Sequence, residues 1–375
     1  MKRNTPFSRI GRHLRQVFYF VASVLIAEAA EPFSAADSQS EGARSSRGHG
    51  QNPVTSLVGS IEIGGPEQYR SLTVFPLLLS QPAVALDLRT LDEALREGWI
   101  EIREKENAEV PVVLVRNNSR YRVFLMAGEV IAGGKQNRMV RDDVLLRPQP
   151  DFVEIPVYCG ERGRWAGSRP MFEATGILAH PELRRKVATG EAQSSVWLEI
   201  ESHSMALGVD STTRDYRHTY EEAGVREKLE DCVRRFRRPP KRDTVGLVAA
   251  FGGRILGCDI FSDPELLAKL WEKLIRSHAV EGLRSEWAGK GGEVAQELVR
   301  DFLRQVFRAS YLEKSSPGEG YLLALSGSVE GAALIWNENV VHLALFGEES
   351  RCPMPPRPPR PGPPIIPFNR PDADF

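Results

Sequence analysis

The chain has 375 residues, of which 41% are hydrophobic and 26% are charged, and its formal net charge is -1. This composition is typical of a soluble globular protein, and the balanced charge indicates no nucleic acid partner. The four cysteines are widely spaced and form no CxxC pattern, which indicates neither a disulfide framework nor a structural zinc site.

Residues 1–30 have the order of charged and apolar residues that is typical of a secretory signal peptide. Basic residues between Lys2 and Arg15 precede an acid-free apolar run over Val17–Ala27, and small residues follow. A stable membrane span needs about 20 apolar residues, so this run is too short for one. A signal peptide predicts a secreted or periplasmic protein, and an unstructured leader on a cytoplasmic protein is the alternative. Residues 31–52 are predicted to form a disordered linker, because they lack hydrophobic periodicity.

Residues 53–165 are predicted to form a β-rich lobe. Asn117-Asn118-Ser119 predicts a hairpin turn within it. One short helix is predicted over Leu91–Glu97, because Thr90 and Glu93 form a capping box and Gly98 can end the helix. Short β-branched or apolar runs predict strands over Leu72–Leu79, Trp99–Arg103, Val110–Val115 and Tyr121–Met126.

Residues 166–347 are predicted to form a lobe of helices followed by hairpin and meander strands. The helical spacing of apolar residues ends at Gly208 in one helix and at Pro239-Pro240 in the next. Gly252-Gly253 predicts a tight hairpin turn between two strands. The remaining predicted elements are a helix opened by Asp263 and Pro264, a helix over residues 292–307, and strands over Tyr321–Leu325, Ala332–Trp336 and Val341–Phe346.

Strands and helices come in blocks rather than in strict alternation, which predicts an α+β fold. We expect mainly antiparallel or mixed sheet in the N-terminal half of the domain, and helices plus hairpin and meander strands in the C-terminal half. Residues 53–347 are thus predicted to form a single domain of two lobes. The proline-rich tail over residues 348–375 cannot bury a core and is predicted to be disordered.

The first candidate ligand surface is the turn over Gly133–Arg138. Lys135 and Arg138 could neutralise a phosphate or carboxylate at a glycine turn whose backbone N–H groups point inward. Gln136 and Asn137 could add hydrogen bonds to the same ligand. The turn is not a Walker A loop, since a glycine stands where that motif requires lysine. The alternative is a hairpin turn with solvated basic side chains.

The second candidate surface is the turn over Gly160–Trp165. Arg162 and Arg164 carry planar guanidinium groups suited to phosphate, and Trp165 could stack on a base or ring. Glu161 could act as a general base if its pKa were raised, and Glu129 is the other carboxylate considered for that role. The alternative is an ion-pair network that closes the turn, with the tryptophan buried in the core.

The sequence identifies no cofactor and predicts no metal site. Cys159 could act as a nucleophile only with a base close in space, and a buried cysteine is commoner. His203 and His218 have no metal-ligating residues at zinc-binding spacings, so both are predicted to be ordinary core or surface histidines. A Gly-x-Ser-x-Gly motif is absent from the sequence, which removes the simplest hydrolase hypothesis.

Nine motifs stand out along residues 128–346. They are Gly128-Glu129-Val130, Gly134-Lys135-Gln136-Asn137-Arg138, Ile155-Pro156-Val157, Cys159-Gly160-Glu161-Arg162-Gly163-Arg164-Trp165, Val196-Trp197, Leu207-Gly208-Val209, Phe251-Gly252-Gly253-Arg254, Asp259-Ile260-Phe261 and Val341-His342-Leu343-Ala344-Leu345-Phe346. In order and spacing these motifs resemble a family of bacterial domains named for association with ADP-ribosylglycohydrolase and rhodanese-phosphatase superfamily proteins. The resemblance covers roughly residues 58–347, and the leader and the proline-rich tail depart from the family's pattern.

The resemblance implies a setting of ADP-ribose, NAD-derived or phosphorylated small-molecule metabolism. It carries no established activity and does not decide whether the protein is an enzyme. Three hypotheses follow. The chain is a ligand-binding or accessory domain for a phosphate-bearing, nucleotide-like molecule, a hydrolase that acts on such a ligand with Glu129 or Glu161 as base, or a scaffold whose polar residues are buried and paired. The oligomeric state is not indicated.

Overall fold

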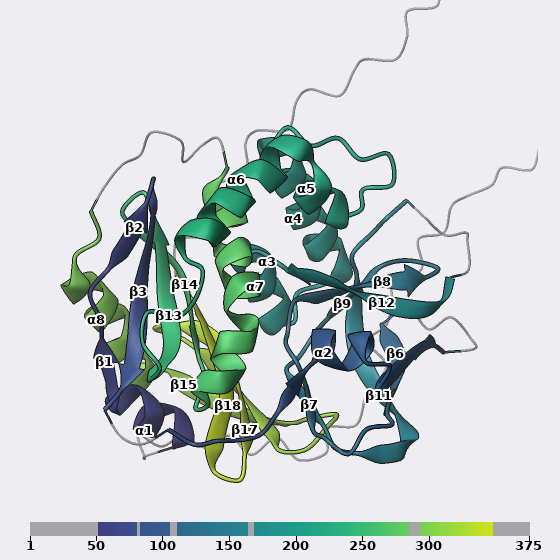
Figure 1. Cartoon of the computed structure of the whole chain (residues 1–375), viewed down its shortest axis with the longest axis horizontal. Helices are drawn as coiled ribbons and strands as arrows, with labels where there is room; N and C mark the ends of the chain where they lie inside the picture. Colours follow the sequence, from purple (N-terminus) through teal and green to yellow (C-terminus); the bar gives the residue numbers. More distant parts are fainter. Residues whose placement is uncertain (1–51, 81–82, 106–110, 164–168, 285–292, 348–375) are drawn as a thin grey trace, which may run out of the picture. The chain divides into compact units, whose positions relative to one another are not determined.

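The computed structural model describes residues 52–80, 83–105, 111–163, 169–284 and 293–347, and Figure 1 shows how their elements are arranged. The predicted signal peptide, the linker up to residue 51 and the proline-rich tail lie outside the described residues. The described strands form three sheets, and helices pack against them. The predicted α+β class, with mainly antiparallel strands, is confirmed.

The largest sheet has nine strands, and all of its neighbouring pairs are antiparallel. Its strand order mixes both halves of the domain, since strands from residues 61–79 lie beside strands from residues 244–346. The order is β1 (Ile61–Ile63), β3 (Leu72–Leu79), β13 (Thr244–Phe251), β14 (Arg254–Ile260), β18 (Asn339–Phe346), β17 (Glu330–Trp336), β16 (Tyr321–Ser326) and β15 (Ser310–Ser315), with β2 (Glu67–Tyr69) paired to β3.

The central strands of this sheet are buried on both faces, which explains their nearly continuous apolar sequence. Along β3, Leu72 and Val74 belong to one hydrophobic core, while Phe75 and Leu77 belong to the other. The first core also holds α7 (Pro264–Gly282), which lies between the two larger sheets in Figure 1. The second core holds α1 (Pro53–Gly59), α8 (Gln296–Arg304) and the 3₁₀ helix over Gln305–Arg308.

The second sheet has six strands and surrounds a third core. Its order is β12 (Arg169–Leu178), β8 (Glu129–Gly134), β9 (Arg138–Val140), β11 (Gln149–Cys159), β6 (Val112–Asn117) and β5 (Ile100–Glu104). The third sheet is β10 (Val144–Leu146), β7 (Val123–Leu125) and β4 (Arg89–Thr90), in which β4 and β7 are parallel. Helix α2 (Leu91–Arg96) closes the third core with two apolar side chains, Leu91 and Ala94.

Local sequence signals explain the best predictions. The capping box of Thr90 and Glu93 is present at the start of α2. Gly252 and Gly253 have φ angles of 57° and 88°, which a tight β13–β14 hairpin requires and glycine tolerates. The hairpin predicted at Asn117 is wrong, because β6 pairs with β5 and β11 whereas β7 lies in the third sheet. The Asn117 amide instead donates to two carbonyl oxygens, Tyr121 O and Leu146 O, as the chain passes from one sheet to the other.

Helices fill most of the segment between β12 and β13. They are α3 (Pro181–Ala188), α4 (Gln193–Ala206), α5 (Arg217–Glu221) and α6 (Ala223–Arg235). The predicted helices that end near Gly208 and near Pro239 correspond to α4 and α6, and the helix opened by Asp263 and Pro264 corresponds to α7. The sequence did not predict α1, α3, α5, β12 or β15. The helix predicted over residues 292–307 begins at Gln296, as α8, and continues into the 3₁₀ helix over Gln305–Arg308.

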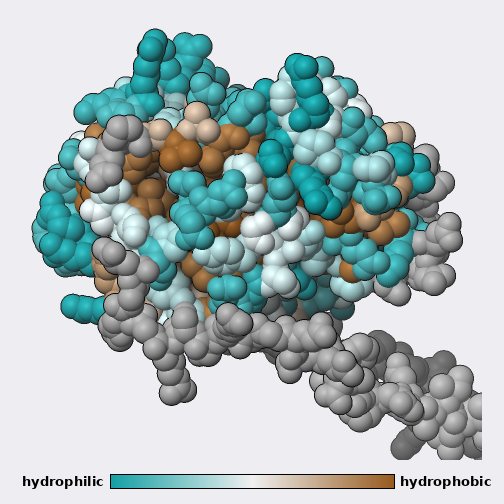
Figure 2. Space-filling model, turned by 90° about the horizontal axis from the view of Figure 1, so that it is seen from below, coloured by the Kyte–Doolittle hydropathy of each residue, from teal (hydrophilic) through white to brown (hydrophobic). Residues whose placement is uncertain are grey.

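Few large apolar side chains are strongly exposed among the described residues, although Figure 2 shows apolar residues reaching the surface between hydrophilic ones. Met171 on β12 and Met205 on α4 are the most exposed of these side chains, at 62% and 69%. Within the described ranges, no helix combines the length and the apolar character needed to cross a membrane.

Candidate functional site

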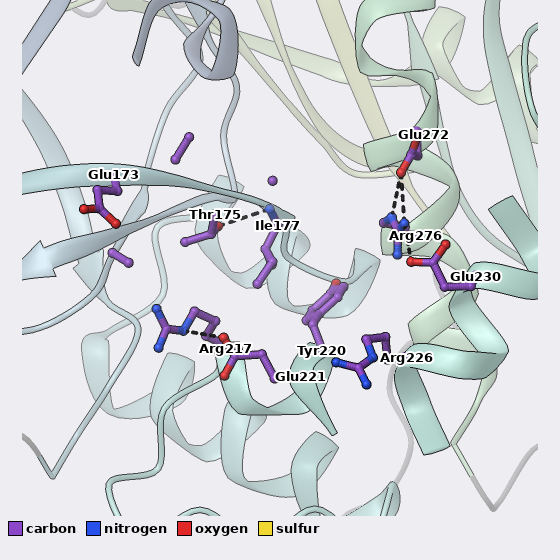
Figure 3. A pocket seen from close by; sticks show the side chains of 13 residues that line it. Glu173, Thr175, Ile177, Arg217, Tyr220, Glu221, Arg226, Glu230, Glu272 and Arg276 are labelled. Atoms are coloured by element: carbon purple, nitrogen blue, oxygen red, sulfur yellow. Dashed lines mark hydrogen bonds and ion pairs between the residues drawn. The ribbon is translucent and has the colours of Figure 1, made fainter. Parts of the chain in front are cut away.

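A cleft of about 510 Å³ lies where β12 meets α5, α6 and α7, and Figure 3 shows the side chains around it. Clefts of roughly 300–1,000 Å³ are typical of small-molecule sites. Its polar lining is unusually rich in charge, with three arginines and four glutamates. These charged residues are Glu173 on β12, Arg217 and Glu221 on α5, Arg226 and Glu230 on α6, and Glu272 and Arg276 on α7.

A β-bulge in β12 shapes one wall of the cleft. The register between β12 and β8 shifts between Ala174 and Leu178. In the shifted segment the Thr175 hydroxyl donates to the Val130 carbonyl oxygen at 2.6 Å, and it accepts from the Ile177 N–H at 3.1 Å. Gly176 has a φ of 68°, a left-handed conformation that glycine adopts readily. The Thr175 hydroxyl thus takes the place of a backbone hydrogen bond between β12 and β8, and β12 bends at the cleft.

Two of the cleft arginines are held by neighbouring carboxylates. Arg276 Nη2 lies 2.8 Å from Glu230 and 2.9 Å from Glu272, and Arg217 Nε lies 3.0 Å from Glu221. Arg226 is exposed, and among the residues that the structure describes no carboxylate forms an ion pair with its guanidinium. Arg226 and Tyr220 both line the cleft (Figure 3), so this exposed guanidinium is available to a ligand there.

The floor of the cleft leads to a buried chain of hydroxyl and imidazole groups. The Tyr220 hydroxyl donates to the Leu178 carbonyl oxygen at 2.7 Å and lies 3.5 Å from the Tyr216 hydroxyl. The Tyr216 hydroxyl lies 2.7 Å from His180 Nδ1. Burial raises the pKa of both tyrosines, so both phenols stay protonated. His180 is in turn one of three adjacent buried side chains, with His203 and Glu281, whose types bind metal ions.

The first predicted ligand turn is buried rather than open. Gln136, Asn137 and Arg138 are at most 4% exposed, and only Lys135 is exposed. Arg138 Nη1 donates to Gln136 Oε1 at 3.1 Å and to Cys159 Sγ at 2.8 Å. Its Nη2 donates to a carboxylate, Glu104 Oε1, at 3.2 Å. The predicted alternative of solvated basic side chains therefore fits Lys135 but not Arg138.

The two predicted turns lie side by side. The Gly160 N–H donates to the Asn137 carbonyl oxygen at 2.9 Å. Both turns also contact Asp215, since Asn137 Nδ2 donates to its carboxylate at 2.9 Å and Glu161 forms a β-bridge with it. Asp215 accepts from the Arg217 N–H at 3.0 Å, so the turns help to position the start of α5 and with it one wall of the cleft.

The remaining residues of the second turn divide between buried and exposed positions. Glu161 is only 2% exposed and lies outside the described lining of the cleft. Arg162 is exposed, and its guanidinium lies 5.4 Å from the centre of the Trp197 ring. Arg164 and Trp165 lie outside the described residues.

Glu129, at the start of β8, forms a buried ion pair. One carboxylate oxygen lies 2.5 Å from Lys273 Nζ, and the other accepts from the Met126 N–H at 2.8 Å. Asp92 also contacts Lys273, at 2.6 Å. Burial raises the pKa of Glu129, while Lys273 opposes that effect. Like Glu161, Glu129 lies outside the described lining of the cleft.

Cys159 has no sign of activation as a nucleophile. Its side chain is fully buried, and burial raises the pKa of its thiol despite the nearby Arg138 guanidinium. A reactive cysteine instead requires a lowered pKa and some exposure. The structure therefore favours the commoner role that the sequence offered for this residue, a buried core cysteine.

A second polar network centres on Asp259 inside the nine-stranded sheet. Arg184 binds both carboxylate oxygens of Asp259, at 2.5 and 3.1 Å. His278 Nε2 and His342 Nε2 lie 3.0 and 3.1 Å from the same carboxylate, and His342 Nδ1 lies 2.7 Å from Asp143. Burial alone would raise the pKa of Asp259, but Arg184 and the two imidazoles lower it well below its usual value.

The sequence could not single out the cleft residues. The cleft arginines lie on helices, where charged side chains are common, and α5 was not predicted. The usable signal was Gly176 inside an otherwise strand-like segment, because an isolated glycine in a strand often marks a bulge.

Residues 60–346 match the model of the family ARPP-1, the ARG and Rhodanese-Phosphatase-superfamily-associated Protein domain. The match confirms the resemblance found in the sequence, and it covers both predicted turns and all the described residues that line the cleft. No curated protein and no solved structure matches the chain.

Proposed function

Since the chain belongs to the ARPP-1 family, we propose that it is a ligand-binding or accessory domain for a phosphate-bearing, nucleotide-like small molecule, which binds in the cleft between β12 and helices α5 to α7. The family name associates such domains with ADP-ribosylglycohydrolases and rhodanese-phosphatases. ADP-ribose and NAD are therefore the first ligands to consider. The proposed site differs from the two turns that the sequence singled out, which instead support one wall of the cleft.

The observation that carries the proposal is the exposed guanidinium of Arg226 in the lining of the cleft, which it shares with Tyr220. A guanidinium can bind two phosphate oxygens at once, and its charge assists both hydrogen bonds. Arg276 and Arg217 already have carboxylate partners, so Arg226 is the cleft arginine best placed to take the phosphate.

The carboxylates of the cleft restrict the chemistry of the ligand. Four glutamates line it beside three arginines, so a ligand with phosphate groups alone would meet more negative than positive charge. A nucleotide-like ligand also carries ribose hydroxyls and base amino groups, which can donate to carboxylates. Phosphates toward Arg226 and donors toward the glutamates would satisfy both kinds of lining group.

Titration calorimetry of the full chain with ADP-ribose and with NAD tests this proposal. One charge-assisted hydrogen-bonding contact is worth about 1.5–3 kcal/mol, so Arg226→Ala should raise Kd by roughly 10- to 100-fold. The matched control is Arg234→Ala, which removes an exposed arginine of the same helix that is paired with Asp231 outside the cleft. Undetectable binding by the wild-type chain, or unchanged Kd in Arg226→Ala, would contradict the proposal.

A second pair of variants locates the ligand. Lys135 is the exposed basic residue of the first turn, and Lys135→Ala should leave Kd unchanged if the ligand occupies the cleft. Loss of binding in Lys135→Ala with normal binding in Arg226→Ala would instead place the ligand on the turns.

The scaffold hypothesis is the second candidate function. It is favoured by the burial of Gln136, Asn137 and Arg138, whose side chains bond other groups of the protein: Arg138 donates to Gln136, and Asn137 donates to Asp215. This hypothesis predicts that neither ADP-ribose nor NAD binds. The hydrolase hypothesis assigns the base to Glu129 or Glu161, and it has no support at this cleft because neither residue lines its described part.

A further inference from the structure

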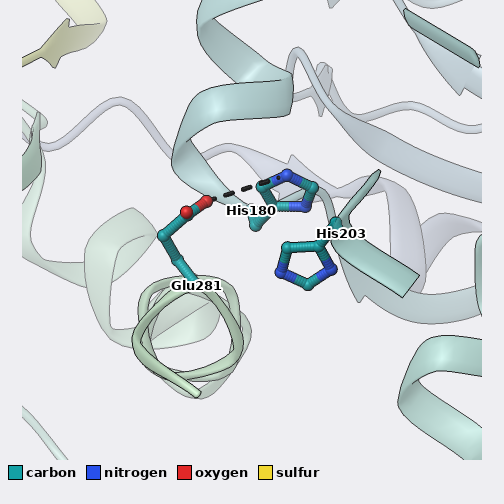
Figure 4. Close-up of side chains that lie close together, drawn as sticks. All are labelled: His180, His203 and Glu281. Carbon is teal, nitrogen blue, oxygen red and sulfur yellow. Dashed lines mark ion pairs between the residues drawn. The ribbon is translucent and has the colours of Figure 1, made fainter. Parts of the chain in front are cut away.

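Three buried side chains from separate elements meet behind the floor of the cleft. They are His180, which precedes α3 at its N-cap position, His203 on α4, and Glu281 in the last turn of α7 (Figure 4). One ligand atom from each lies within 4.8 Å of the others, and none of the three residues is more than 2% exposed. We refer to these residues as the histidine cluster.

His203 provides the strongest sign that the cluster binds something. Neither of its ring nitrogens has a hydrogen-bond partner among the described residues. The backbone of Val280 approaches the ring, but no hydrogen bond of normal geometry joins them. A buried polar group without a partner costs about 1–3 kcal/mol. Because native proteins rarely leave such groups unmatched, a fully buried imidazole with two unpartnered nitrogens calls for a ligand.

His180 presents its Nε2 atom to carboxylate oxygens. Its Nδ1 lies 2.7 Å from the Tyr216 hydroxyl, while Nε2 lies 3.2 Å from Glu199 Oε1 and 3.7 Å from Glu281 Oε2. With a cation bound, Nδ1–H would donate to the Tyr216 hydroxyl and the Nε2 lone pair would face the cation beside the two carboxylates. A metal-binding histidine commonly donates its other ring N–H in this way. Without a cation, the Tyr216 hydroxyl donates to Nδ1 and Nε2–H donates to Glu199.

Glu281 of the histidine cluster and the neighbouring Glu199 are already oriented by other groups. Arg284 Nη1 lies 3.4 Å from Glu281 Oε1 and 3.2 Å from Glu199 Oε1. The Glu182 N–H donates to Glu281 Oε2 at 3.4 Å. Such contacts around a site fix the direction of its ligand atoms, and they are a regular part of metal sites in proteins.

We propose that His180, His203 and Glu281 bind a divalent transition-metal ion, with Glu199 beside them as a further oxygen ligand. Two imidazoles and a carboxylate suit Zn²⁺ and ions of similar preference. The site is closed to solvent, so the ion would join α3, α4 and α7 and, through Tyr216 and Tyr220, stabilise the floor of the cleft. This proposal stands independently of the ligand proposed for the cleft.

Metal binding requires a defined rearrangement of the two rings. The rings of His180 and His203 are stacked, with centres 3.8 Å apart and planes at 12°. Ligand atoms about 2.1 Å from a tetrahedral Zn²⁺ ion lie about 3.4 Å from one another. The His203 ring must therefore turn out of the stack, and the separation of up to 4.8 Å between ligand atoms must close by up to about 1.4 Å.

Metal binding by the purified full chain tests the proposal without any nucleotide. After removal of metal with a chelator, the wild-type chain should take up one equivalent of Zn²⁺ in equilibrium dialysis, and Co²⁺ should give the visible absorption of a protein-bound ion. His203→Gln should lower the Zn²⁺ affinity at least about 100-fold, because loss of a direct ligand exceeds the 10- to 100-fold effect of outer partners. His218→Gln is the matched control, since this histidine instead bonds Ser211, and it should bind as the wild type does.

Circular dichroism checks that each variant is folded, and Glu281→Gln serves as a second variant with the same expected loss. The proposal is overturned if the folded wild-type chain binds less than a stoichiometric amount of Zn²⁺, or if a folded His203→Gln or Glu281→Gln variant binds as the wild type does. Thiolate-to-cobalt charge-transfer bands would also overturn it, because they would place the ion on a cysteine.

Discussion

His342 should make the stability of the domain depend on pH in the alkaline range. Both of its ring nitrogens face carboxylates, Asp143 at 2.7 Å and Asp259 at 3.1 Å, so both carry a proton and the ring is charged. Burial alone would lower the pKa of His342, but the two aspartates raise it from 6.5 to about 9. Replacement by a neutral residue, His342→Gln, removes this charge.

The magnitude and the sign of this pH dependence of the free energy of unfolding follow from the linkage between protonation and folding. Each unit of pKa difference corresponds to about 1.4 kcal/mol, so the raised pKa contributes about 3 kcal/mol to the free energy of unfolding. Because the pKa is higher in the folded chain, this contribution is complete below about pH 6.5 and is lost as the pH rises through about 9. The stability difference between wild type and His342→Gln should therefore shrink by about 3 kcal/mol over that range.

Urea denaturation of both proteins between pH 6 and pH 10 measures this difference. The control variant is His218→Gln, whose histidine is partly exposed and bonded to a serine hydroxyl. The free energy of unfolding of this control should depend on pH in the same way as that of the wild type. This pH dependence would be refuted if the difference in free energy of unfolding between wild type and His342→Gln stayed constant across the pH range.

Two further predictions concern the region of the turns. Glu129→Gln should lower the free energy of unfolding by about 3 kcal/mol, because it leaves Lys273 with one buried partner fewer. The exposed Glu272→Gln control should cost less than about 1 kcal/mol in the same urea denaturation, and equal losses would speak against a structural role for Glu129. Gly134→Ala should lower Tm more than Gly190→Ala does. Both glycines have a positive φ, but a side chain at position 134 would meet Glu104 and the Phe172 ring at 2.5 and 2.8 Å, whereas position 190 is open. Similar losses of Tm would show that backbone strain alone matters.

Elements with strong local signals were predictable from the sequence. A capping box at Thr90, a glycine pair at Gly252-Gly253 and a proline after Asp263 each specify local backbone geometry without help from distant residues. The strand β12 was missed because its bulge at Gly176 interrupts the alternation of apolar and polar residues on which strand prediction depends.

The candidate site was less predictable because burial is decided by distant partners. Arg138 follows a glycine turn, where a basic residue is normally solvated, yet Glu104 and Cys159 hold it inside the protein. Conversely, Arg226 looks like an ordinary helix-surface residue, and only the packing of α6 against α5 and α7, with β12 across the cleft, gives it a cleft to face. Long-range contacts of this kind leave no local pattern in the sequence.

The place of β3 in the nine-stranded sheet affects how the chain can fold during synthesis. β3 leaves the ribosome early, but its neighbour β13 begins at Thr244, and β18 ends the described core at Phe346. Until those strands exist, Phe75 and Leu77 lack the sheet that buries them. Pairing over such separations is slow and leaves apolar strands exposed. We therefore expect nascent chains that end before β13 to be prone to aggregation and to depend on chaperones.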